Sequence, residues 1–122
     1  MKNNNKKWIL ENSYSNLPSC FYKKIKPTLV QNPKIVCFNE GLAKKINLEF
    51  LCNDISLITN YFSGNKLPES SISIAQAYAG HQFGYFTMLG DGRAILLGEQ
   101  KGLNNNLYDI QLKGAGRTSF SR

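Results

Sequence analysis

The sequence of 122 residues predicts an α+β fold, in which two short helices are followed by an antiparallel three-stranded meander. Three observations support this fold class. Helix-capping residues precede two apolar stripes of helical spacing in the first half of the chain. The second half is rich in β-forming runs, and a Gly-Asp-Gly turn separates two of these runs. We expect a boundary between residues 74 and 75, with the helices before it and the meander after it.

Both helices are expected to be short. The first extends from Asn39, its N-cap, through Ile46, because an asparagine side chain accepts a hydrogen bond from a free amide of the first turn. The second covers Asp54–Phe62, with Asn53 as the N-cap and Gly64 as the stop. The expected apolar faces comprise Leu42, Ala43 and Ile46 in the first helix, and Ile55, Ile58, Tyr61 and Phe62 in the second.

The meander is expected to consist of three consecutive strands. Phe83–Leu89 and Arg93–Gln100 form a hairpin across the turn Gly90–Gly92. A loop rich in asparagine, Lys101–Leu107, then leads to the strand Tyr108–Lys113. This last strand has the clearest alternation in the chain, because its apolar residues occupy every second position and its polar residues occupy the others.

Three further segments have a weaker pattern. Lys34–Phe38 is β-rich and follows a proline, which predicts a strand. Ile74–Tyr78 is expected to be a short helix or a turn. Trp8–Leu10 is an apolar segment after a basic N-terminus, and it is expected to pack against another part of the protein.

The glycine turn and the last strand together carry the residues that suit a phosphate group. Gly90 and Gly92 permit positive φ angles and close approach of the backbone, so that amide groups can point at an anion. Arg93 and Lys113 add positive charge, and a polyphosphate requires this combination of donors. Each residue also has a purely structural interpretation, since Asp-Gly is a common hairpin turn and a lysine on an edge strand discourages aggregation.

Charge and cysteine content restrict the function further. The 15 Lys and Arg residues exceed the 8 Asp and Glu residues, so the formal net charge is +7 and anionic partners are favoured, although scattered lysines also serve solubility. Cys20, Cys37 and Cys52 are widely spaced and His81 is the single histidine, which argues for reduced thiols rather than a zinc site. Neither a transmembrane run nor a secretory signal is present, so we expect a cytoplasmic protein without membrane contacts.

Three phrases of the sequence closely resemble the selenoprotein O family. They are Ala75–Gly84, Leu89–Ala94 and Gln111–Gly116, and shorter matches occur at Asn12–Tyr14 and Leu42–Ala43. The order of strand, glycine turn, strand, loop and lysine-bearing strand is also that of a protein-kinase small lobe, although the kinase glycine and lysine motifs are absent. The resemblance covers essentially the whole chain.

The resemblance implies a kinase-like protein adenylyltransferase, which uses ATP and Mg²⁺ to transfer AMP to Ser, Thr or Tyr hydroxyls of other proteins. By the same resemblance, Gly90, Gly92, Arg93 and Lys113 bind ATP, and residues 75–122 begin the nucleotide-binding lobe after an N-terminal extension, residues 1–74. The family's catalytic aspartate and metal ligands match no position here, so we expect an N-terminal fragment that is inactive alone. His81 lies in a family phrase but is assigned no chemical role.

The alternative is a small basic module without enzymatic activity, which binds nucleic acid or an acidic protein. Seven Phe and six Tyr residues amid positive charge would permit base stacking. No RNA-recognition motif supports this alternative, and we expect no specific nucleic-acid partner. Salt dependence separates the two hypotheses, because binding through several phosphates of a nucleic acid weakens steeply as salt rises.

Overall fold

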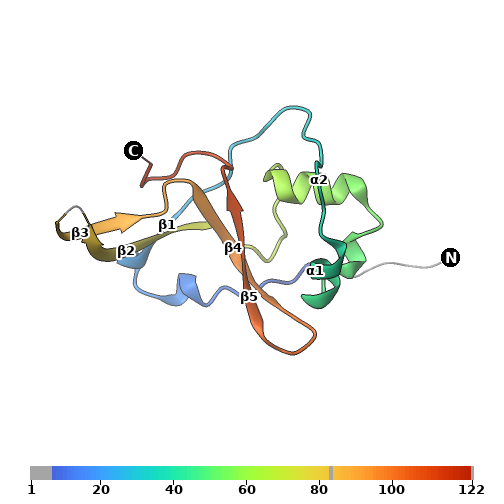
Figure 1. The fold of residues 1–122 in the computed structure, drawn as a ribbon, viewed down its shortest axis with the longest axis horizontal. Coiled ribbons are helices and arrows are strands. Elements are labelled where there is room, and N and C mark those ends of the chain that lie inside the picture. The colour runs from blue at the N-terminus through green and yellow to red at the C-terminus, as the bar shows by residue number, and fades with distance from the viewer. Residues whose placement is uncertain (1–6, 83, 122) are drawn as a thin grey trace.

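The computed structural model describes residues 7–82 and 84–121, and these form the predicted α+β fold with a small antiparallel sheet (Figure 1). The helices are α1 (Glu40–Lys45) and α2 (Ile55–Ser63), with short 3₁₀ turns at Tyr14–Asn16, Ser19–Phe21 and Glu49–Leu51. The strands are β1 (Tyr22–Lys24), β2 (Ile74–Gln82), β3 (Tyr85–Gly90), β4 (Ala94–Lys101) and β5 (Leu107–Lys113). Both helices lie toward one end of the molecule, and the β2–β3 pair extends toward the other (Figure 1).

The connectivity of the sheet differs from the predicted meander. The strand order is β1-β2-β4-β5, and β3 pairs with β2 rather than with β4. The glycine turn therefore joins two separate hairpins instead of closing one. Part of the reason lies at Gly84, whose φ of +83° suits the tight reversal between β2 and β3. Phe83, the first residue of the predicted strand Phe83–Leu89, lies outside the described residues.

Two other expectations about the secondary structure are wrong. Ile74–Tyr78, expected to be a helix or a turn, is extended and starts β2, where Ile74 pairs with Leu96 of β4. Lys34–Phe38 forms no strand, and Val36 at its centre is 99% exposed. β-propensity alone does not make a strand, because a strand needs a neighbour that supplies hydrogen bonds and a packed face. β1 instead occupies the outer position beside β2.

The helices are close to their predicted ranges. Asn39 caps α1, since its Oδ1 accepts a hydrogen bond from the Leu42 amide at 2.9 Å. Asp54, rather than Asn53, caps α2 through Oδ1, which accepts from the Leu57 amide at 3.0 Å. Gly64 ends α2 with a φ of +86°, as predicted.

The apolar faces of the helices are only partly buried. Ala43, Ile46, Ile58 and Tyr61 belong to the core, as predicted. Leu42 and Ile55 are exposed, and Phe62 is 37% exposed at the edge of the core. A helix this short contacts the sheet along a narrow strip, so the residues at the margins of the predicted stripe remain in water.

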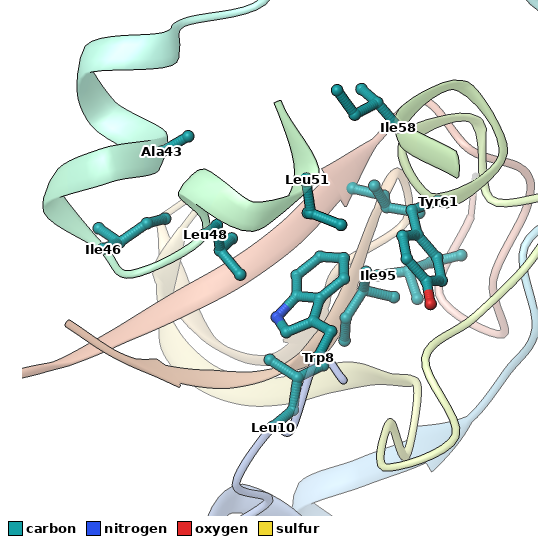
Figure 2. Close-up of a cluster of buried hydrophobic side chains, with 11 residues drawn as sticks. Trp8, Leu10, Ala43, Ile46, Leu48, Leu51, Ile58, Tyr61 and Ile95 are labelled. Carbon is teal, nitrogen blue, oxygen red and sulfur yellow. The ribbon is translucent and has the colours of Figure 1, made fainter. Parts of the chain in front are cut away.

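The core lies between the helices and the β4–β5 hairpin, and Trp8 is at its centre (Figure 2). The Trp8 side chain is 3% exposed, and its ring meets the Tyr61 ring edge-on at a centroid distance of 5.1 Å. Its Nε1 donates a hydrogen bond of 2.8 Å to Oε1 of the buried Gln100 in β4. The predicted docking of Trp8–Leu10 therefore takes place within this chain. The cluster comprises Trp8, Leu10, Ala43, Ile46, Leu48, Leu51, Ile58, Tyr61, Ile95, Leu97 and Leu112.

β5 has the predicted alternation and lies at one edge of the sheet order. Leu112 is buried, and Tyr108 and Ile110 are partly buried on the same face. Asp109, Gln111 and Lys113 point the other way and are exposed. No helix among the described residues is long and apolar enough to span a membrane.

Candidate functional site

The glycine turn crosses from the β2–β3 hairpin to the β4–β5 hairpin. Gly90 ends β3 and pairs with Ala77, and the Asp91 amide donates a hydrogen bond of 2.9 Å to the Gln76 carbonyl of β2. The Asp91 amide is thus bonded to the sheet and does not point at a ligand. Neither Gly90 nor Gly92 has a positive φ, contrary to the expectation from the sequence. Another property of glycine explains these two positions.

That property is the absence of a side chain, because residues 118–121 lie directly against the turn. A Cβ at Gly90 would be 2.2 Å from Cγ of Phe120, and a Cβ at Gly92 would be 3.0 Å from the Phe120 carbonyl oxygen. Two hydroxyl groups also bind the turn. Thr118 Oγ1 donates to the Asp91 carbonyl at 2.5 Å, and Ser121 Oγ donates to the Gly92 carbonyl at 2.6 Å. Residues 118–121 therefore hold the turn in place by packing and by hydrogen bonds.

A surface pocket of about 490 Å³ opens between the turn and this segment. It is lined by Gly90, Gly92, Arg93, Gly116, Arg117, Phe120 and Ser121. Three of the four residues predicted to bind a nucleotide lie here. Arg93 and Arg117 are its charged lining residues, so the pocket suits an anion, and two guanidinium groups can each bind phosphate oxygens in a bidentate manner.

Lys113, the fourth predicted residue, lies beside the pocket but does not line it. It is exposed at the end of β5, where it pairs with Ala94, the residue after Arg93. The next amide, that of Gly114, donates a hydrogen bond of 2.7 Å to the Arg93 carbonyl. The backbone thus brings Lys113 and Arg93 to the same end of the β4–β5 hairpin.

Among the residues that the structure describes, no carboxylate lies within 4.0 Å of the charged groups of Arg93, Lys113 or Arg117. Among the described residues, the one ion pair joins Lys7 Nζ and Glu69 Oε2 at 3.9 Å, far along the chain from the pocket residues. Asp91 is partly buried within the turn, and burial raises the pKa of its carboxyl group above the ordinary value of 3.8. Arg93, Lys113 and Arg117 thus bring positive charge to this region, and Asp91 adds one carboxyl group.

Arg117, Phe120 and Ser121 line the pocket but were not predicted from the sequence. A usable signal was present, because Gly116-Arg117 repeats the dipeptide Gly92-Arg93. Gly116 has a φ of +131°, which turns the chain after β5 toward the pocket.

Other groups considered in the sequence lie elsewhere. Cys20 and Cys37 are exposed, Cys52 is partly buried, and all three are free thiols. His81 lies in β2 and pairs with Phe86. A second hollow of about 540 Å³, largely apolar, lies between residues 33–39, the two helices and β5, and none of the predicted nucleotide-binding residues lines it.

The described site is thus a basic, glycine-lined pocket on an α+β domain. The sequence matches the family described as protein adenylyltransferase SelO over residues 5–122, and the chain belongs to this family. Proteins named protein nucleotidyltransferase YdiU are similar to it: 56% identical over 94% of the chain in Pelagibacter ubique, 52% over 95% in Shouchella clausii, and 56% over 93% in Clostridium botulinum. The chain spans about a quarter of the length of these curated relatives, because the matches cover 24%, 24% and 23% of them.

Proposed function

We propose that this chain contributes the phosphate-binding part of a protein adenylyltransferase, which transfers AMP from ATP to Ser, Thr or Tyr hydroxyls of other proteins. The observation that carries the proposal is the pocket itself. It places Gly90, Gly92 and Arg93 in one hollow, with Lys113 beside it, within a chain of a nucleotidyltransferase family. These four residues are the proposed ATP contacts.

The remaining features of the proposal follow from the same assignment. Residues 75–122 are the start of a kinase-like nucleotide-binding lobe, and residues 1–74 are an extension that packs on it through Trp8 and the two helices. The partners are ATP and protein substrates in the cytoplasm, without a membrane or a specific nucleic acid. The hairpin arrangement around the turn means that this lobe would hold phosphates at a junction between two hairpins, not inside one.

The proposed reaction also uses Mg²⁺, and the described residues do not fit this ion. They contain no group of three His, Cys, Asp or Glu side chains that could hold a metal. We therefore assign no metal ligand and no catalytic residue to this chain. Its own residues are proposed to bind and orient the triphosphate.

The proposal is tested by ATP binding to the 122-residue chain, measured by isothermal titration calorimetry. A charged hydrogen bond contributes about 1.5–3 kcal/mol, so Lys113→Ala is expected to raise the Kd for ATP at least about tenfold. Lys44→Ala is the matched control, because this substitution removes the same charge from the exposed last turn of α1. Equal effects of the two substitutions, or the absence of ATP binding, would contradict the proposed site.

The same titration tests the nucleic-acid alternative. Single-stranded RNA is added at increasing salt, and the Kd for ATP is followed in parallel. The basic binding module would be favoured if the affinity for RNA is higher than the affinity for ATP and falls steeply as the salt concentration rises. We expect ATP to bind more tightly than RNA, with the weaker salt dependence.

A further inference from the structure

We propose that Arg117 is a second phosphate-binding guanidinium of this pocket, and that the hydroxyls of Thr118 and Ser121 position the glycine turn for it. This inference rests on the proposed function, since it adds residues to the same site. The ligand class is a di- or triphosphate, bound between Arg93 and Arg117. Three features of the structure support it.

The first feature is that the backbone before Arg117 is fixed. Gly116 has a φ of +131°, and a Cβ there would be 2.3 Å from Thr28 Oγ1, so only glycine fits. The Thr28 amide also donates a hydrogen bond of 2.8 Å to the Ala115 carbonyl. The path of the chain from β5 to Arg117 is therefore set by the segment around Thr28. The backbone of Arg117 is therefore positioned at the pocket wall before a ligand binds.

The second feature is the charge of the pocket. Arg93 and Arg117 both line it, and no carboxylate among the described residues lies within 4.0 Å of either guanidinium. Two unneutralised cations in one hollow repel each other, and a polyanion between them removes that repulsion. A phosphate chain also has enough oxygen atoms for two planar guanidinium groups.

The third feature concerns the carbonyl groups of the turn. Carbonyl oxygens carry partial negative charge and would repel a phosphate. Thr118 Oγ1 and Ser121 Oγ donate to the carbonyls of Asp91 and Gly92, at 2.5 and 2.6 Å. These bonds keep both oxygens occupied and hold the turn against residues 118–121. Thr118 and Ser121 are thus positioning residues, whereas Arg117 contacts the ligand.

The test measures the Kd of the 122-residue chain for ATP and for inorganic tripolyphosphate by calorimetry. Arg117→Ala is expected to raise both values at least about tenfold. Arg117→Lys is expected to restore part of this loss, because lysine keeps the charge but not the planar fork. The control is Lys101→Ala, which removes the same charge at the far end of β4, where Lys101 is exposed and pairs with Leu107.

The positioning role is tested by Ser121→Ala, which deletes one hydroxyl at the turn. We expect a smaller rise in Kd, of about two- to tenfold, with an unchanged number of binding sites. Circular dichroism spectra and urea midpoints of all variants show whether each is folded. An unfolded Arg117→Ala variant is replaced by Arg117→Lys and Arg117→Gln, which keep most of the side chain.

The outcomes separate the two proposals. If the wild-type chain binds neither ATP nor tripolyphosphate, the proposed function fails at this site. If it binds both and Lys113→Ala weakens binding, while Arg117→Ala behaves as Lys101→Ala, the proposed function stands and the role of Arg117 is wrong. Loss of ATP binding with unchanged tripolyphosphate binding would also overturn the inference, because it would place Arg117 away from the phosphates.

Discussion

Replacement of Gly90 by alanine tests the packing of the glycine turn against Phe120. The added Cβ would be 2.2, 2.4 and 2.5 Å from Cγ, Cδ1 and Cδ2 of the Phe120 ring. Carbon atoms without a bond between them rest at about 3.5–4.0 Å. The ring must therefore move by more than about 1 Å, and overpacking of this kind costs about 1–3 kcal/mol. We expect Gly90→Ala to lower the free energy of unfolding by this amount.

The matched control is Gly41→Ala in α1. A Cβ at Gly41 meets Asn39 Oδ1 at 3.6 Å, which is an ordinary contact. Alanine also loses less backbone entropy than glycine when a helix forms, so this substitution is expected to stabilise the protein by about 0.5–1 kcal/mol. The same chemical change thus has opposite signs at the two positions.

The assay is urea denaturation followed by circular dichroism, with a double-mutant cycle. In a Phe120→Ala background the ring is absent. Gly90→Ala should then lower the free energy of unfolding by at least about 1 kcal/mol less than it does in the wild type. The urea dependence of the unfolding free energy should stay the same if only native packing changes. An equal cost of Gly90→Ala in both backgrounds would refute the claim that Phe120 is the reason for glycine at this position.

Three further predictions concern other parts of the molecule. Trp8→Ala removes the centre of the core and should lower the free energy of unfolding by about 3–5 kcal/mol in urea titrations. Asp91→Asn should stabilise the protein at pH 7, because burial raises the pKa of Asp91 in the folded state. The difference in free energy of unfolding between variant and wild type should shrink as the pH falls through that raised pKa toward 3.8. Urea titrations at several pH values measure this difference. The 122-residue chain with labelled ATP, Mg²⁺ or Mn²⁺ and a protein acceptor should incorporate no more label than Lys113→Ala; a clear excess would contradict this.

Local sequence alone determined several elements of this protein. Asn39 caps α1 through the neighbouring turn, and Gly64 ends α2, because both effects depend only on residues a few positions away. The alternation of β5 likewise shows which face is buried. The family motifs were also readable without coordinates, and the family match over residues 5–122 confirms that reading.

Partners distant in the sequence decided the rest. Residues 74–82 became a strand because they pair with β1, β3 and β4, and no local pattern shows which neighbour a strand will meet. Lys34–Phe38 lacks such a neighbour and stays outside the sheet. Trp8 reaches Gln100 across 92 residues, and a contact of that separation is invisible in a local window.

The pocket combines both kinds of information. Its glycines and arginines were visible in the sequence, but the reason for the glycines was not. The sequence suggested that these glycines permit positive φ angles, whereas the structure shows that Gly90 and Gly92 make room for Phe120 and Ser121. Sequence specifies which chemical groups are available. Only tertiary packing decides which of them share one hollow, because that depends on the whole path of the chain between them.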